Sequence, residues 1–174
     1  SLRCNRADTG DLRYSVQSTS GQKHTISFWL KRSELSTTYG QRLFKSSYNT
    51  FIKFNAEDDL TINLRAEAAI DETSGLSDLV ITTNRLFRDT SAWYNIVIAI
   101  DTTQGTASNR VKLYVNGVQE TSFSASAYPD QNHYVQGFST AVTILLLGQS
   151  PNYAEYFGGY VADINMIFGT AYAA

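Results

Sequence analysis

The side chains best suited to chemistry in this 174-residue sequence gather in two segments that combine tyrosines with amides and acids. The segments are 128–134 and 149–157, and each contains one of the only two prolines. Flat aromatic rings pack on the apolar faces of sugars, while Asn, Asp and Gln bind hydroxyl groups. Both segments are therefore candidates for carbohydrate binding. The candidate residues are Tyr128, Asp130, Asn132, His133, Tyr134, Asn152, Tyr153, Glu155 and Tyr156.

The same tyrosines have a structural alternative. They could cap the core or pack against a neighbouring subunit, because tyrosine is also enriched at protein interfaces. If the two segments meet at one end of the domain, we expect a shallow aromatic and polar groove between them. The sequence leaves both interpretations open.

Patterns for catalysis are absent from the sequence. Glycosidases need two carboxylates about 5–10 Å apart across a cleft, whereas Glu57, Asp58 and Asp59 are consecutive. We interpret these acids as solvated turn residues. His24 and His133 lie beside no nucleophile-elbow sequence, so no hydrolytic triad is predicted. The sequence thus predicts a protein that is not an enzyme.

Composition restricts the partners further. The net charge is -2 and the 14 Lys and Arg residues are scattered, so no nucleic-acid partner is predicted. No apolar run approaches the roughly 20 residues of a membrane helix, so no membrane insertion is predicted. The single cysteine, Cys4, excludes an intramolecular disulfide. The chain opens without Met or an apolar signal stretch, which suggests a processed product or a piece of a longer polypeptide.

Alternation with a period of two residues predicts the strands that must position these segments. Within 25–31, Ile26, Phe28 and Leu30 share one face and are expected in the core. Segments 51–55 and 61–65 predict a hairpin joined through an acidic turn. The nearly continuous apolar run 93–100 predicts a central strand that is covered on both faces.

The sharpest local signal is Asn116-Gly117, which follows the alternating residues Val111, Leu113 and Val115. Asn-Gly at this point favours a type I′ turn and predicts a hairpin over 110–121. Further strands are predicted at 142–147 and 160–168. About ten or more short strands with little helical pattern predict an all-β fold, a two-sheet antiparallel β-sandwich that forms a single domain over 1–174.

The two tryptophans occupy different kinds of position. Trp93 opens the predicted central strand, which favours a place in the core or at a sheet edge. Trp29 faces away from Ile26, Phe28 and Leu30, so it lies either on the second face of its sheet or in a concave groove.

The order of the motifs resembles a known family. Those at 1–3, 26–32, 93–97, 113–117, 147–148 and 157–164 together resemble the laminin-G-like branch of the concanavalin A-like lectin/glucanase domains, over nearly the whole chain. Segments 28–32, 101–104 and 107–112 resemble versions of this domain in bacteriophage structural and tail proteins. The resemblance implies a jelly roll with a concave face, whose rim loops bind glycan or calcium in many relatives. The Glu-x-Asp-x-x-Glu pattern of the glucanases is absent.

The resemblance also makes calcium the one candidate cofactor, because such domains often hold the ion with loop carboxylates and carbonyls. Asp58 with Asp59, and Asp101 with Asn109, are the candidate ligands. No Asp-x-Asp-x-Asp spacing supports either pair, so solvated turn acids are the favoured interpretation.

Two functions fit these observations. One is a non-catalytic recognition module of a phage particle, on the virion surface and so extracellular, which binds host-surface glycans through aromatic rim loops. The other is a structural virion module, for capsid decoration or tail oligomerisation, that binds only protein. The expected partners are a surface polysaccharide or other virion proteins. We also expect a homo-oligomer or display in many copies, which converts weak single-site binding to avidity.

Overall fold

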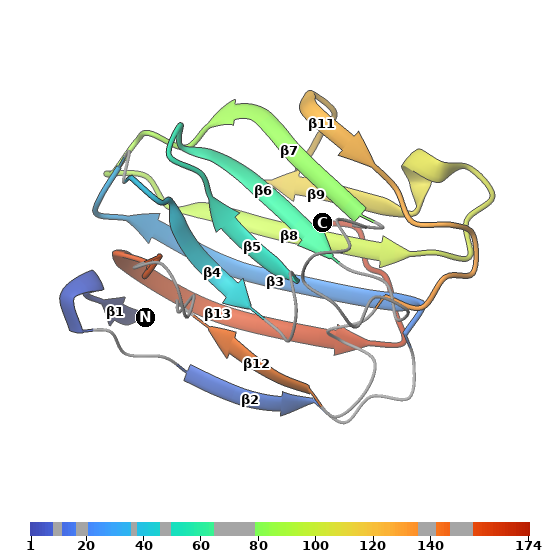
Figure 1. Ribbon diagram of the computed structural model, residues 1–174, viewed down its shortest axis with the longest axis horizontal. Coiled ribbons are helices and arrows are strands. Elements are labelled where there is room, and N and C mark those ends of the chain that lie inside the picture. The colour runs from blue at the N-terminus through green and yellow to red at the C-terminus, as the bar shows by residue number, and fades with distance from the viewer. Residues whose placement is uncertain are drawn as a thin grey trace.

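The computed structural model describes residues 1–8, 12–16, 21–35, 38–45, 50–64, 79–135, 142–146 and 155–174. Within these residues, two antiparallel β-sheets pack face to face (Figure 1). The predicted all-β sandwich is confirmed. The two helices in the described part of the chain are single 3-10 turns, η1 (Arg6–Asp8) and η2 (Ala107–Asn109), and neither has the length or the apolar character to cross a bilayer.

The first sheet has six strands in the order β1-β13-β3-β8-β9-β10. Their bounds are β1 Leu2–Cys4, β13 Gly159–Phe168, β3 Lys23–Arg32, β8 Tyr94–Asp101, β9 Val111–Val115 and β10 Val118–Glu120. The second sheet has seven strands in the order β11-β7-β6-β5-β4-β12-β2. Their bounds are β11 Phe123–Ala127, β7 Leu79–Leu86, β6 Asp59–Leu64, β5 Phe51–Phe54, β4 Gln41–Lys45, β12 Val142–Leu146 and β2 Leu12–Val16.

The core lies between the sheets and follows the predicted alternation. Ile26, Phe28 and Leu30 of β3 are all buried, as expected for every second residue of a half-buried strand. The Phe28 ring lies 4.9 Å from that of Phe44 on β4, so aromatic packing joins the two sheets. The Ile52 and Phe54 side chains of β5 fill the facing layer.

Strand β8 is central and is covered on both faces, as predicted. Ile96, Ile98 and Ile100 point into the core, while Val97 and Ala99 belong to a smaller cluster on the outer face of the six-stranded sheet. This double coverage explains why the segment is apolar almost without interruption.

The chain after β13 supplies part of that outer cover. The hydroxyl of Thr25 donates a hydrogen bond to the Thr170 carbonyl at 3.0 Å and accepts one from the Tyr172 N–H at 2.8 Å. Ala171, between these two residues, packs against the cluster that contains Val97 and Ala99. The C-terminal segment (169–174) is thereby fixed across the outer face of the six-stranded sheet.

The predicted hairpin is confirmed as β9 and β10. Asn116 and Gly117 connect the two strands with φ of 51° and 78°, the two positive values that a type I′ turn requires. Successive side chains of β9 point alternately into the core and outward, so Lys112 and Tyr114 face away from the core.

We expect Gly117→Ala to lower the free energy of unfolding by about 1 kcal/mol, because a Cβ is strained at this positive φ although no atom lies within 4 Å of it. Gly105→Ala is the matched control, since its Cβ also meets open space and its φ lies outside the strained range. Urea denaturation should show no loss for the control. Equal losses for the two variants would contradict the assigned turn type.

The acidic turn between β5 and β6 differs from the solvated turn that was predicted. Glu57 is exposed, but Asp58 is fully buried. One Asp58 carboxylate oxygen lies 2.9 Å from Nη2 of Arg32, and the other accepts a hydrogen bond from Nε of Arg88 at 3.1 Å. The prediction was wrong for Asp58 because Arg32 and Arg88 come from distant segments of the chain.

Arg32 itself is buried at the end of β3, in the opposite sheet. Its Nη1 donates to the Phe87 carbonyl at 2.9 Å, and its guanidinium lies 4.4 Å from the centroid of the Phe54 ring. Burial lowers the pKa of Arg32, while the ion pair with Asp58 opposes that change. The buried ion pair therefore ties the two sheets together at this end of the sandwich.

Candidate functional site

The two tyrosine-rich segments lie toward opposite ends of β3, a strand of ten residues or about 30 Å. The loop 128–135 is at its start, where the Val135 N–H donates to the Gly21 carbonyl at 2.8 Å. The described part of the second segment, 155–157, leads into Gly158, whose carbonyl accepts the Ser33 N–H at 3.0 Å just beyond the end of β3. The structure does not bring these parts together into one groove.

Loop 128–135 is held against the turn that follows β8. The Asn132 N–H donates to the Thr102 carbonyl at 2.8 Å, and the Thr102 hydroxyl donates to the His133 carbonyl at 2.7 Å. Asp130 is exposed, and Tyr134 has 48% of its surface exposed. The loop is thus anchored through its backbone and leaves these two side chains at the solvent.

The second segment is held differently. Glu155 is buried, pairs with Arg42 and accepts a hydrogen bond from Nζ of Lys53 at 3.1 Å. Tyr156 is partly buried and forms an isolated bridge with Arg42. Glu155 therefore neutralises two cations in the structure. The candidates Asn152 and Tyr153 lie outside the described residues.

The first pair of predicted calcium ligands does not fit an ion. Both oxygens of Asp58 are occupied by Arg32 and Arg88, and Asp59 accepts a hydrogen bond from the Asn55 amide. Calcium needs six to eight oxygen ligands that are free to bind it. Across the described segments, no group of three or more His, Cys, Asp and Glu side chains could hold a metal ion.

The second pair does not fit either. Oδ1 of Asp101 accepts hydrogen bonds from the hydroxyl and the N–H of Thr103, the latter at 3.1 Å. Oδ2 accepts one from Nε2 of Gln104 at 2.8 Å and lies 3.3 Å from Nζ of Lys23. Burial raises the pKa of Asp101, but these hydrogen bonds outweigh it and leave the pKa below its ordinary value. Asp101 is therefore a charged residue whose hydrogen bonds fix the turn after β8. Asn109 lies nearby on η2.

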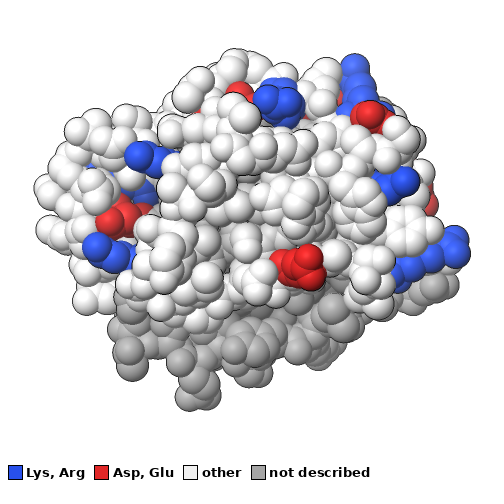
Figure 2. All heavy atoms as spheres, turned by 180° about the vertical axis from the view of Figure 1, so that it is seen from behind, with Lys and Arg blue, Asp and Glu red and all other residues white. Residues whose placement is uncertain are grey.

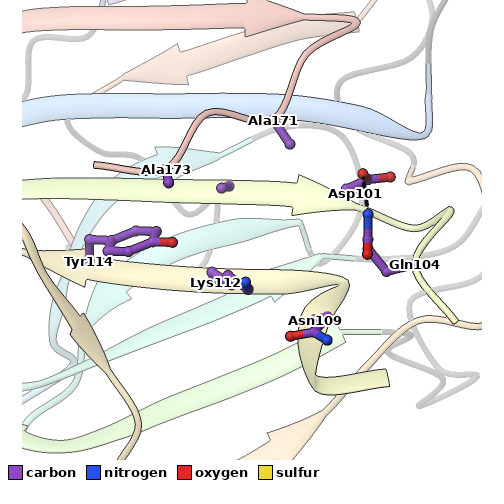
Figure 3. A pocket seen from close by; sticks show the side chains of 8 residues that line it. Asp101, Gln104, Asn109, Lys112, Tyr114, Ala171 and Ala173 are labelled. Atoms are coloured by element: carbon purple, nitrogen blue, oxygen red, sulfur yellow. Dashed lines mark hydrogen bonds between the residues drawn. The ribbon is translucent and has the colours of Figure 1, made fainter. Parts of the chain in front are cut away.

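Asp101 and Asn109 nevertheless line one shallow hollow of about 170 Å³ (Figure 3). It lies on the outer face of the six-stranded sheet, where β8 and β9 meet η2 and the C-terminal segment. Alanines form its apolar wall, and the rest of its lining is polar or aromatic. The lining residues are Ala99, Asp101, Gln104, Asn109, Lys112, Tyr114, Ala171 and Ala173.

The side chains of this hollow offer hydrogen-bonding groups and part of an aromatic ring. The Asn109 backbone N–H donates to the Thr106 carbonyl at 3.0 Å. In the described part of the chain, no hydrogen bond engages the side-chain amide of Asn109 and no acid pairs with Lys112, so both side chains are open to a ligand. Tyr114, two residues after Lys112 on the same face of β9, is 8% exposed and contributes the edge of its ring. An amide, an ammonium group and a ring beside a charged carboxylate suit a saccharide.

A second hollow of about 340 Å³ lies on the other side of η2 and shares Asn109 with the first. Tyr128, the first residue of the predicted tyrosine loop, lines it and packs partly against the core. Of the predicted residues, Asp101 and Asn109 thus line the first hollow, and Asn109 and Tyr128 line the second. Sequence reasoning missed Lys112 and Tyr114, although their outward positions in the predicted hairpin were a readable signal.

Both tryptophans lie at the surface. Trp93, predicted for the core or a sheet edge, precedes β8 and is 37% exposed. Trp29 is 39% exposed and lies on the outer face of the six-stranded sheet, opposite to the core residues of β3. The Trp93 ring lies 6.4 Å from that of Tyr160 on β13.

Charged side chains are dispersed over the surface of the molecule seen from behind (Figure 2). Lysines and arginines lie mainly toward the edges of this view, with acidic groups among them and uncharged side chains between. On the part of this face that the structure describes, the uncharged surface is broader than any basic cluster.

Solved structures with a similar fold include three from different sources. Domain 4 of AbnA, a GH43 extracellular arabinanase from Geobacillus stearothermophilus, in complex with arabinotriose, is 16% identical, with a TM-score of 0.59 over 98% of this chain and 71% of that one. A native heptameric SAP-like pentraxin from Limulus polyphemus is 12% identical, with a TM-score of 0.56 over 90% and 68%. Botulinum neurotoxin type C, which depends on interaction with two ganglioside molecules, is 13% identical, with a TM-score of 0.57 over 99% and 42%.

These likenesses show the fold. No curated protein sequence matches the chain. A family model, Laminin_G_3 of the concanavalin A-like lectin/glucanases superfamily, matches residues 7–171. Because that match covers nearly all of the sequence and agrees with the two-sheet architecture, the chain belongs to the concanavalin A-like lectin/glucanases superfamily.

Proposed function

We propose that this domain is a non-catalytic saccharide-binding module whose site is the hollow beside η2. The observation that carries the proposal is the convergence of Asn109, Lys112 and Tyr114 in that hollow, next to the charged Asp101. Such a set binds hydroxyl groups through the amide and the ammonium group, while the exposed edge of the largely buried Tyr114 ring borders the ligand. The alanine wall adds apolar contact.

Similar domains support the choice of a saccharide. The AbnA domain was solved with arabinotriose, botulinum neurotoxin type C depends on ganglioside molecules, and a binding domain of botulinum neurotoxin DC was solved with SialylT. These proteins share only the fold with this chain, so they indicate a class of ligand and no individual sugar.

Three carboxylates of the described residues, Asp101, Asp58 and Glu155, support binding without catalysis. Glycosidic cleavage needs a general acid, whose pKa must be raised to keep a proton near neutral pH. The pKa of Asp101, the carboxylate in the hollow, is lowered instead, so the group is ionised there. Asp58 and Glu155 are each neutralised by two basic side chains.

We further propose that the module is displayed in many copies on the surface of a phage particle and holds host-surface glycans outside the cell. The motifs at 28–32, 101–104 and 107–112, which resemble phage structural and tail proteins, support this location. Electron microscopy of the particle with an antibody against the domain tests it. Label confined to the particle interior would exclude a role in host recognition.

We expect the double variant Asn109→Ala, Lys112→Ala to lose glycan binding by about tenfold or more, because both ligand-binding groups of the hollow are removed. Binding is measured on an array of bacterial and plant glycans and repeated by calorimetry in solution. Tyr39→Ala, an exposed aromatic just before β4 in the other sheet, is the control and should bind like the wild type. Unchanged binding by the double variant would remove the hollow as the site.

A further inference from the structure

Three aromatic side chains lie together on the outer face of the six-stranded sheet, away from the hollow. Trp29 lies on β3, where the register pairs it with Ala162 of β13 on one side and with Asn95 of β8 on the other. Tyr160 pairs with Lys31, two residues further along β3, and its ring lies 6.4 Å from that of Trp93. We name Trp29, Trp93 and Tyr160 the aromatic surface.

The backbone that carries the aromatic surface is ordered by hydrogen bonds. Trp29 lies within a strand that is hydrogen-bonded on both sides. The loop before Trp93 is fixed by the Asp89 carboxylate, which accepts hydrogen bonds from the Ser91 N–H at 2.8 Å and the Ala92 N–H at 3.2 Å. A backbone that is already ordered loses little conformational freedom when a ligand binds.

Polar side chains border these rings on the same sheet face. The register places Asn95 directly opposite Trp29, and it places Asn165 of β13 opposite Ser27 of β3. Ser27 is two residues from Trp29, so its side chain points to the same face. Amides and a hydroxyl beside exposed rings are a combination that suits a sugar, although the Asn165 amide nitrogen already donates to the Asp163 carbonyl at 2.8 Å.

The exposed area also favours a small ligand over a protein. Trp29 and Trp93 are 39% and 37% exposed and Tyr160 is less exposed, which amounts to about 250 Å² of aromatic surface at most. A stable protein interface needs about 800 Å² from each partner. The three rings alone fall well short of that area, and they match the contact area of a few sugar units.

The aromatic surface and the hollow lie on one face of the sheet, at opposite ends of β8. The strand runs from Tyr94, next to Trp93, to Asp101 in the hollow, over about 25 Å. A short oligosaccharide reaches one of these places, and an extended polysaccharide reaches both. Contact at the first place raises the effective concentration of the same chain at the second.

We propose that the aromatic surface is a second saccharide-contact site, and that the ligand of the domain is a polysaccharide segment held at the hollow and at Trp29, Trp93 and Tyr160 together. This inference rests on the proposed function for its first contact point. It adds the second contact point and the polymeric class of the ligand.

Tryptophan fluorescence distinguishes the two places. The chain has two tryptophans, and both belong to the aromatic surface, whereas the hollow contains none. Linear arabinan, dextran, polygalacturonate and the strongest polysaccharide from the glycan array are each titrated into the full chain, with calorimetry as an independent measure of binding. We expect a polymer that binds to change the tryptophan emission.

Trp29→Ala should lower the affinity for that polymer by about tenfold or more, because the second contact and its effective-concentration gain are lost. Tyr160→Ala is the second variant, and Tyr39→Ala is the matched aromatic control, with urea denaturation confirming that each is folded. Polymer binding that leaves the emission unchanged, and that both variants retain in full, would overturn the second contact while the hollow still stands. If no polysaccharide binds the wild type in solution or on the array, both proposals fail.

Discussion

Replacing Asp58 with asparagine should lower the free energy of unfolding by about 3–5 kcal/mol, because it leaves the buried Arg32 guanidinium as an uncompensated charge. Both side chains of this ion pair are fully buried, with 2.9 Å between the charged groups. Asparagine keeps the size of the side chain and tolerates the φ of 69° at this position. The loss therefore reports the charge rather than a cavity or a strained turn.

Urea denaturation followed by circular dichroism measures this loss. Arg88→Ala is the matched control, since Arg88 contacts the other oxygen of the same carboxylate but its side chain is 56% exposed. We expect it to lose about 1 kcal/mol or less. A loss of similar size in the two variants would contradict the special role of the buried pair.

The double variant Arg32→Met, Asp58→Asn tests whether the losses caused by removing each charge depend on the other charge. Removing both charges should be less destabilising than the two single losses added together, because neither partner is left unpaired. Additive losses would show that Arg32 and Asp58 stabilise the fold independently of each other.

The domain should also lose stability in mild acid through His24. Burial lowers the pKa of this imidazole from 6.5 to about 4, and a hydrogen bond with the Gly21 backbone only partly opposes the change. The unfolded chain therefore binds a proton at a higher pH than the native one. The contribution of neutral His24 to the free energy of unfolding is present in full above pH 6.5 and is lost as the pH falls to about 4. The free energy of unfolding decreases by about 3 kcal/mol over this range.

The comparison variant is His24→Phe, which keeps a ring next to Phe168, its edge-to-face neighbour at 5.7 Å. Unfolding free energies of both proteins are measured between pH 4 and 7. The difference between them should change by about 3 kcal/mol across this range, while titration of the carboxylates cancels in it. A difference that stays constant with pH would show that His24 takes up its proton in the native state.

The features that could be predicted from the sequence are those that depend on neighbours along the chain. Alternation of apolar residues placed Ile26, Phe28 and Leu30 in the core, and both the strand and the burial are confirmed. Asn116-Gly117 predicted its hairpin because two positive φ values are a local requirement. Local chemistry was sufficient in both cases.

The features that were missed depend on which distant segments come together. The sequence around Asp58 predicts a solvated turn acid, but in the structure β3 of the other sheet places Arg32 against it. The aromatic surface exists only because the register sets Tyr160 and Trp29 on adjacent strands, next to Trp93. The two tyrosine segments have similar compositions, yet their described parts lie toward opposite ends of a ten-residue strand. Composition cannot specify such positions.

The six-stranded sheet ends in two very short strands, β1 and β10, of three residues each. Unpaired backbone at a sheet edge is a template on which another chain can add a strand and begin to aggregate. Here the outermost strands offer only three residues each, and Val118, the one apolar residue of β10, lies beside the tight turn. Copies of this domain can therefore be crowded close together with little tendency to join through β1 or β10.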